Sequence, residues 1–189
     1  MSFIIVLASN SPRRKELLTK MGVAFKIRIK EVNEDFPSHL SPKEVAEYLA
    51  KKKSSAYRAS VMPNELVITA DTLVSCKDKI LNKPETQKEA RQMLEFLSNN
   101  THEVITGVSL MTSKKQLVFS VISKVTFGEL STKEIIKYVD SGLPMDKAGA
   151  YGIQDWIGTI GVTKIEGSYE NIVGLPTQEL HRQLKGFIA

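Results

Sequence analysis

The sequence predicts an α/β fold built on a mixed β-sheet. In the first half of the chain, apolar runs precede amphipathic segments, as at 3–7 and 12–21, and this order is typical of parallel βα units. Farther on, the strand-like segments 103–111 and 117–127 flank a short polar stretch at 113–115, as antiparallel hairpins do. The combination indicates one mixed sheet, and we expect it to bend across a central cleft.

The first elements are a strand, a helix and a second strand. The apolar run 3–7 predicts a buried strand. Ser11 suits the N-cap of a helix over 12–21, because its hydroxyl accepts a backbone N–H, and Pro12 suits the first helical position. The segment 24–29 then predicts a strand.

Three capping boxes mark the starts of later helices. In this motif a Ser or Thr caps the helix, and a Glu three residues later reaches back to the cap. The motif begins at Ser41, Thr86 and Ser131. The predicted helices are 41–59, 86–97 and 131–140, and Gly142 ends the third.

The remaining elements are strands and a final helix. The apolar run 66–70 predicts a buried strand ending at Asp71, and a strand or hairpin follows over 73–81. A Gly-rich tract occupies 146–174. Within it we expect strands at 151–154 and 160–166, and a helix over 177–187 closes the chain.

Composition indicates an ordinary globular protein. The chain has 189 residues, 42% of them hydrophobic and 25% charged, so we expect a single domain over 1–189. A formal net charge of +5 permits an anionic partner without specifying one. A nucleic-acid binder would interleave its cations with aromatic residues on one face; the sequence has no such pattern, and we expect no nucleic-acid partner.

Cysteine content and hydropathy bear on the cellular location of the protein. Cys76 is the single cysteine, which excludes an internal disulfide and a multi-cysteine zinc site. The apolar start is too short for a signal peptide, and no run approaches the length of a membrane span. We therefore expect a reduced, cytoplasmic location and no membrane partner.

The start of the first helix breaks an electrostatic rule. Arg13, Arg14 and Lys15 crowd its first turn, where the helix dipole is already positive. An anion would relieve this repulsion, and the hydroxyls of Ser9 and Ser11 with two guanidiniums suit a phosphate. The alternative is a surface helix with solvated arginines.

Two carboxylates and a lysine are candidates for chemistry. Asp71 at the end of a buried strand is either a metal ligand or general base, or the N-cap of the next element; the extended pattern that follows disfavours the cap. Glu34 is an ordinary loop residue taken alone, but it suits a divalent cation shared with Asp71. Lys83 stands before Pro84, which fixes its turn.

The Gly-rich segment 146–154 ends at Gln154. Small residues allow a ligand to approach the backbone closely, although tight packing explains the glycines equally well. The amide of Gln154 offers a donor and an acceptor to a nucleobase edge. Cations, carboxylates and this amide together indicate a triphosphate site.

Five motifs in order span nearly the whole chain. They are SNSPRR at 9–14, ADTLV at 70–74, LNKP at 81–84, DKAGAY at 146–151 and EGSYENIVGLP at 166–176. This set closely resembles the Maf family of nucleotide pyrophosphatases. The resemblance implies a Maf/inosine-triphosphatase-like α/β fold with an elongated mixed sheet, two lobes flanking a deep cleft, and a homodimer. It also implies a hydrolase that converts a nucleoside triphosphate to the monophosphate and pyrophosphate with a divalent cation (Mg, Mn or Co).

The resemblance assigns roles to individual residues. Asp71 matches the family's general base, and with Glu34 it matches the metal position; Lys83 matches a catalytic cation. Further positions around the metal and phosphates are Ser9, Arg13 and Arg14.

Substrate choice is also implied by the resemblance. Arg13, Thr72 and Gln154 match positions that distinguish members acting on dTTP and UTP; the resemblance leaves modified pyrimidine nucleotides open as substrates. The chain departs from the family at Asp155 and Trp156, where glycine commonly follows the glutamine. Trp156 is either a packing residue, a base-stacking residue or part of a lid.

A second reading is a non-catalytic nucleotide-binding regulator of cell division or septum formation. It predicts tight binding of a triphosphate without turnover. It leaves the presence of both Asp71 and Glu34 to be explained.

Overall fold

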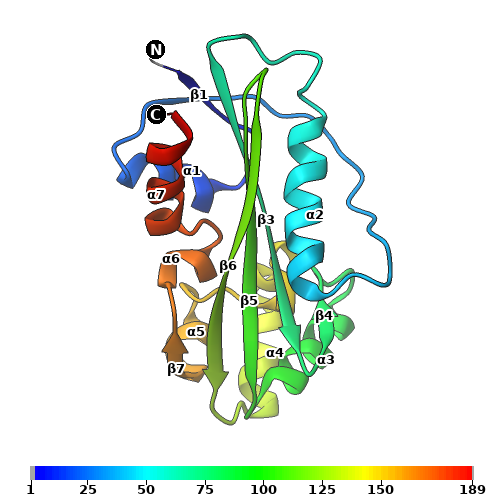
Figure 1. The fold of residues 1–189 in the computed structure, drawn as a ribbon. Helices are drawn as coiled ribbons and strands as arrows, with labels where there is room; N and C mark the ends of the chain where they lie inside the picture. Colours follow the sequence, from blue (N-terminus) through cyan, green and yellow to red (C-terminus); the bar gives the residue numbers. More distant parts are fainter. Residues whose placement is uncertain (1–2, 189) are drawn as a thin grey trace. The chain divides into compact units, whose positions relative to one another are not determined.

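The computed structural model describes residues 3–188 (Figure 1). The chain divides into two compact units. Among the described residues, unit 1 comprises 3–71, 106–121 and 174–188, and unit 2 comprises 72–105 and 122–173.

The strands form one seven-stranded mixed sheet, as expected, in the order β2-β1-β3-β5-β6-β7, with β4 paired to β3. Strand β1 runs parallel to both β2 and β3, whereas β4 and β7 run antiparallel to β3 and β6. The strands are β1 (Ile4–Leu7), β2 (Phe25–Ile27), β3 (Glu65–Cys76), β4 (Lys79–Leu81), β5 (Thr101–Met111), β6 (Gln116–Phe127) and β7 (Val162–Glu166).

The helices start where the capping residues predict. The α-helices are α1 (Pro12–Lys20), α2 (Pro42–Ser55), α3 (Gln87–Leu97), α4 (Thr132–Asp140), α5 (Trp156–Gly161), α6 (Tyr169–Val173) and α7 (Thr177–Ile188), and the 3-10 helices are η1 (Leu143–Asp146) and η2 (Ala148–Ala150). Ser11 caps α1 by accepting the N–H of Arg14 at 3.3 Å. Reciprocal capping boxes form at Ser41 and Ser131. At Thr86 only half of the box forms, because the Glu89 carboxylate accepts a different N–H, that of Glu85.

The structure corrects two predicted strand boundaries. Asp71 lies inside the continuous strand β3 and not at a strand end, because the residues after it remain paired in the sheet. The predicted strand at 151–154 is wrong: Ile153 and Gln154 form a turn, in which the N–H of Asp155 donates to the carbonyl of Gly152 at 3.0 Å.

The end of the chain holds two helices that the sequence did not predict. Helix α5 takes the start of the strand expected at 160–166, so β7 begins only at Val162. Helix α6 is a second short helix of the Gly-rich tract. The final helix is confirmed as α7. No helix among residues 3–188 is long and apolar enough to cross a membrane.

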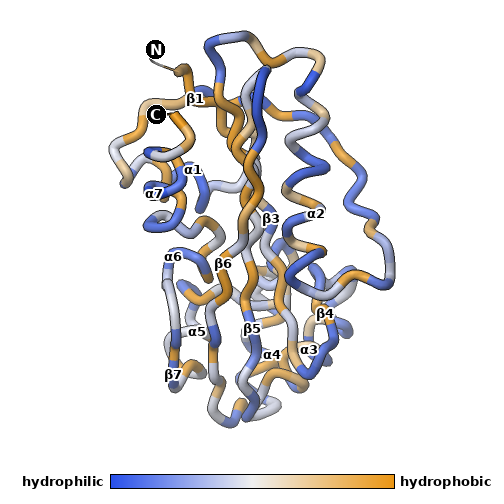
Figure 2. Tube along the Cα trace, in the orientation of Figure 1, coloured by the Kyte–Doolittle hydropathy of each residue, from blue (hydrophilic) through white to orange (hydrophobic). Residues whose placement is uncertain are grey.

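In unit 1, helix α2 packs closely on the sheet. A Cβ added at Gly107 of β5 would lie 2.1 Å from the carbonyl oxygen of Ala46, so only glycine fits this contact. The hydroxyl of Thr69 on β3 donates to the carbonyl of Ala50 at 2.7 Å. Figure 2 shows hydrophilic and hydrophobic residues alternating along α2 and α7, as in helices that bury one face. These contacts fix α2 against β3 and β5.

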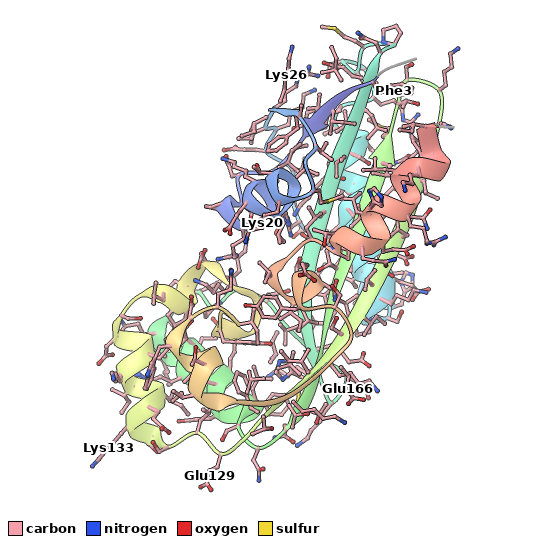
Figure 3. The ribbon with its side chains drawn as sticks, turned by 90° about the vertical axis from the view of Figure 1, so that its left-hand side faces the viewer. Phe3, Lys20, Lys26, Glu129, Lys133 and Glu166 are labelled. Carbon is pink, nitrogen blue, oxygen red and sulfur yellow. The ribbon has the colours of Figure 1, made fainter. Side chains whose placement is uncertain are left out.

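Unit 2 has its own core, with three aromatic rings packed together. His102 is buried; its Nε2 lies 2.7 Å from the hydroxyl of Tyr151, and its ring centroid lies 5.5 Å from that of Phe127. Burial lowers the pKa of His102 to about 4. Figure 3 shows Lys133, near the start of α4, pointing away from this core, whereas Tyr138 of the same helix is buried in it.

Candidate active site

The start of α1 brings three of the predicted phosphate ligands together in unit 1. The Oγ of Ser9 accepts the N–H of Ser11 at 3.2 Å and lies 3.5 Å from Nη1 of Arg14. The Nε of Arg14 donates to the carbonyl of Gly174 at 2.9 Å, which orients the guanidinium. The first turn of α1 contains no acidic residue, so hydroxyls, guanidiniums and the helix dipole all favour an anion here.

Charges of both signs surround Arg14. Burial lowers the pKa of Arg14 from its ordinary value, and the neighbouring positive charge of Arg13 acts in the same direction. The carboxylates of Asp71 and Glu34 act against this shift. The guanidinium is therefore half-buried and within electrostatic reach of both acids, and its partial burial strengthens its attraction for an anion that binds.

A lysine joins the two predicted metal ligands. The Nζ of Lys53, near the end of α2, lies 2.5 Å from Oδ1 of Asp71 and 2.7 Å from Oε1 of Glu34. The Asp71 side chain is 12% exposed and that of Glu34 is 51% exposed. The structure thus brings both carboxylates to one point, from a strand and from a loop, with a cation between them.

Lys53 is a site residue that none of the motifs predicted, because a run of three lysines at 51–53 is typical of a solvated helix face. Lys51 is indeed exposed, and Lys52 donates to the backbone carbonyl of Asp35 at 2.8 Å. The helical period held the missing signal. Lys53 follows the buried Leu49 by four residues, so it lies on the same face of the helix.

The donor set at this point fits a divalent cation. No group of three or more His, Cys, Asp or Glu side chains that could hold a metal occurs among residues 3–188. However, Mg²⁺ commonly binds through one or two carboxylates and takes its other ligands from substrate phosphates and water. The ammonium of Lys53 already occupies a position in contact with both Asp71 and Glu34, so the two oxygens can converge on one cation.

The other predicted residues belong to unit 2. Thr72 is half-buried on β3, and Lys83 is exposed in the segment between β4 and α3. The N–H of Gly149 donates to the carbonyl of Asn82 at 3.3 Å, so the turn that carries Lys83 is joined to the Gly-rich segment. Gln154 is exposed.

Gly149 is required where it stands. Its φ is +69°, which favours glycine, and a Cβ there would lie 3.0 Å from a methyl group of Val74. Both constraints act at the same residue. Tight packing, the alternative left open by the sequence, therefore accounts for glycine at position 149.

One solved structure supports the assignment of the fold. The Staphylococcus aureus Ham1 protein matches with a TM-score of 0.54 and 16% identity, over 96% of this chain and 98% of that one. At this identity the match concerns the fold alone. It agrees with the predicted inosine-triphosphatase-like architecture.

Curated relatives cover nearly the whole chain. A protein of Bacteroides thetaiotaomicron named "dTTP/UTP pyrophosphatase" is 50% identical over 96% of this chain and 94% of its own length. A Flavobacterium psychrophilum protein of the same name is 48% identical over 95% and 92%. The profile described as "Maf-like protein" matches residues 4–187. The chain therefore belongs to the Maf-like protein family.

Proposed function

We propose that the chain is a nucleoside triphosphate pyrophosphatase that hydrolyses dTTP and UTP to the monophosphate and pyrophosphate. The names of its relatives support this activity. The observation that carries it is the convergence of Asp71 and Glu34 on the ammonium of Lys53. The same two carboxylates oppose the lowering of the Arg14 pKa. Acidic and basic side chains therefore lie near one another in unit 1.

Asp71 acts as the general base in this proposal. Its carboxylate accepts a proton from water as the water oxygen bonds to the α-phosphorus, and the bond from phosphorus to the bridging oxygen breaks. Pyrophosphate leaves with the electron pair of that bond. Arg13 and Arg14 stabilise the charge that develops on the leaving group, which is the main requirement in phosphoryl transfer.

Asp71 and Glu34 would hold a divalent metal. When bound, Mg²⁺, Mn²⁺ or Co²⁺ would neutralise negative charge on the phosphate oxygens. Lys53 offsets the repulsion between the two carboxylates in the free protein. Its ammonium contacts the same oxygens that the metal needs, so Lys53 and the metal compete for them.

Roles in unit 2 are proposed from the sequence. Lys83 supplies a further cation to the phosphates, and Thr72 and Gln154, together with Arg13, select the pyrimidine. Modified pyrimidine nucleotides are candidates for the physiological substrate. We also propose one Maf-like domain over 1–189, supported by a family match that spans both units, and a cytoplasmic homodimer, which light scattering would test.

A substrate panel tests the activity. Standard and modified triphosphates are incubated with Mg²⁺, Mn²⁺ or Co²⁺, and both pyrophosphate and orthophosphate are measured. We expect pyrophosphate from dTTP and UTP, with little from GTP. Release of orthophosphate alone would contradict cleavage between the α- and β-phosphates. Tight binding without turnover would favour the non-catalytic regulator.

A further inference from the structure

A partly buried polar cluster in unit 2 contacts the turn that carries Gln154. The hydroxyl of Tyr138 on α4 donates to Oδ2 of Asp155 at 2.5 Å. The same hydroxyl oxygen accepts the backbone N–H of Gly152 at 3.2 Å. The Nζ of Lys147 lies 3.5 Å from Oδ2 of Asp155. One phenol therefore holds both ends of the turn 152–155.

The charged groups of the cluster contact neighbouring polar groups. The Lys147 side chain is only 10% exposed, and its Nζ also contacts the carbonyl of Leu143 at 2.6 Å and the carboxylate of Asp146 at 2.7 Å. Burial and the hydrogen bond to Asp155 raise the pKa of Tyr138 well above its ordinary value. Tyr138 thus remains a neutral donor throughout any assay range.

Gly152 lets the cluster close against the backbone. A Cβ at this residue would lie 2.5 Å from Oδ2 of Asp155 and 2.8 Å from Cε of Lys147. Asp155 occupies the N-cap position of α5 without making a side-chain cap. Its carboxylate is therefore directed to Tyr138 and Lys147.

Gln154 gains its direction from this turn. Its side chain is exposed, so packing does not hold it. The turn is closed by the N–H of Asp155 on the carbonyl of Gly152 at 3.0 Å, and the carbonyl of Asp155 accepts the N–H of Thr159 at 3.1 Å. The backbone on both sides of Gln154 is thereby fixed.

We propose that Tyr138, Asp155 and Lys147 are positioning residues that fix the turn 152–155 and so set the preference of Gln154 for a pyrimidine edge. The inference rests on the proposed role of Gln154 as base reader. A correctly oriented amide discriminates between bases because a mismatched base covers its donor or acceptor without pairing it. A mobile turn would lose that discrimination while the phosphates still bind.

The test compares Tyr138→Phe, Asp155→Ala and Asp155→Asn with the wild type. Dissociation constants are measured for α,β-imido analogues of UTP and GTP, which need no turnover. We expect the preference for UTP over GTP to fall by about tenfold in Tyr138→Phe and Asp155→Ala. Asp155→Asn should retain more of it, because its amide oxygen still accepts the phenol. In turnover, KM for UTP should rise while kcat changes little.

Matched controls separate positioning from general destabilisation. Tyr48→Phe makes the same change at an exposed tyrosine of α2, and Asp140→Asn removes an exposed carboxylate of α4 paired with Arg91. Neither should alter the preference. Hydrogen–deuterium exchange without nucleotide should rise within 152–156 in Tyr138→Phe, and unchanged exchange there would refute the inference.

The variant Gln154→Ala distinguishes a failure of the base-reader role of Gln154 from a failure of the positioning role. If Gln154→Ala leaves the preference intact, the base-reader role is wrong and the inference falls with it. If Gln154→Ala lowers the preference but Tyr138→Phe and Asp155→Ala do not, the positioning role alone is wrong. We expect Tyr138→Phe to add nothing further in the Gln154→Ala background. Absence of pyrophosphate release by the wild type would reject the catalytic proposal and leave the binding and exchange results to decide on the cluster.

Discussion

Replacing Lys53 by methionine should destabilise unit 1 and leave the carboxylates of the proposed metal site without a competing ammonium. The substitution keeps an unbranched side chain that is one atom shorter, and it removes the charge that contacts Asp71 and Glu34. Removing one partner of a buried ion pair costs about 3–5 kcal/mol, whereas an exposed pair is worth about 1 kcal/mol or less. Since Asp71 is 12% exposed and Glu34 is 51% exposed, the loss at Asp71 dominates. We expect the free energy of unfolding to fall by about 3 kcal/mol.

Mg²⁺ should restore much of that loss. In Lys53→Met the two carboxylates have no competing ammonium, so a divalent cation binds them more readily than in the wild type. A ligand at one hundred times its dissociation constant stabilises the folded state by about 2.7 kcal/mol. The assay is urea unfolding followed by circular dichroism, with and without Mg²⁺. Lys51→Met is the control, because Lys51 is exposed on the same helix.

Two results would refute this reasoning. Equal stability of Lys53→Met and Lys51→Met would show that the contacts of Lys53 with the two carboxylates contribute little. Equal stabilisation of wild type and Lys53→Met by Mg²⁺ would show that the ammonium and the metal do not compete for the same oxygens. The second result would also remove Glu34 and Asp71 as the proposed metal ligands.

Three further predictions concern the base, the Gly-rich segment and the buried histidine. Asp71→Asn should lower kcat for pyrophosphate release by about 10²–10⁴-fold, whereas Asp78→Asn, in the turn between β3 and β4, should not; near-normal turnover would rule out Asp71 as base. Gly149→Ala should lower the melting temperature more than Gly142→Ala, because both residues have a positive φ but only Gly149 meets a neighbour; equal losses would mean that packing on Val74 is unimportant. Burial lowers the pKa of His102 to about 4, so on acidification the unfolded chain binds a proton before the folded protein does. The free energy of unfolding should therefore fall between about pH 6.5 and about pH 4, by up to about 1.4 kcal/mol per pH unit. His102→Gln should flatten this part of the pH profile measured by urea unfolding, and an unchanged slope would contradict the prediction.

Local chemistry explains what the sequence predicted well. The caps at Ser11, Ser41 and Ser131 depend on contacts within four residues, and all three formed as expected. The turn at Gln154 was predicted as a strand because its neighbours are apolar and the segment is too short to show a helical or strand periodicity. The turn is also bonded to Tyr138, sixteen residues before Gln154, and no local pattern reveals this contact.

The candidate site was predicted unevenly for the same reason. Ser9, Ser11 and Arg14 are neighbours in sequence and lie together in the structure. The pairing of Glu34 with Asp71 required a third residue, Lys53, from a separate helix. The hairpin predicted over 73–81 formed as the pairing of β3 with β4, but its first strand is continuous with the buried strand that was predicted to end at Asp71.

The contact at Gly107 has an evolutionary consequence. A single methyl group at this residue would collide with the backbone of α2 at Ala46, and a backbone atom cannot be changed by a compensating mutation. Any larger residue would have to move the helix that carries Lys53. Position 107 is therefore closed to variation in descendants that keep this carboxylate–lysine arrangement, although it contributes no atom to it.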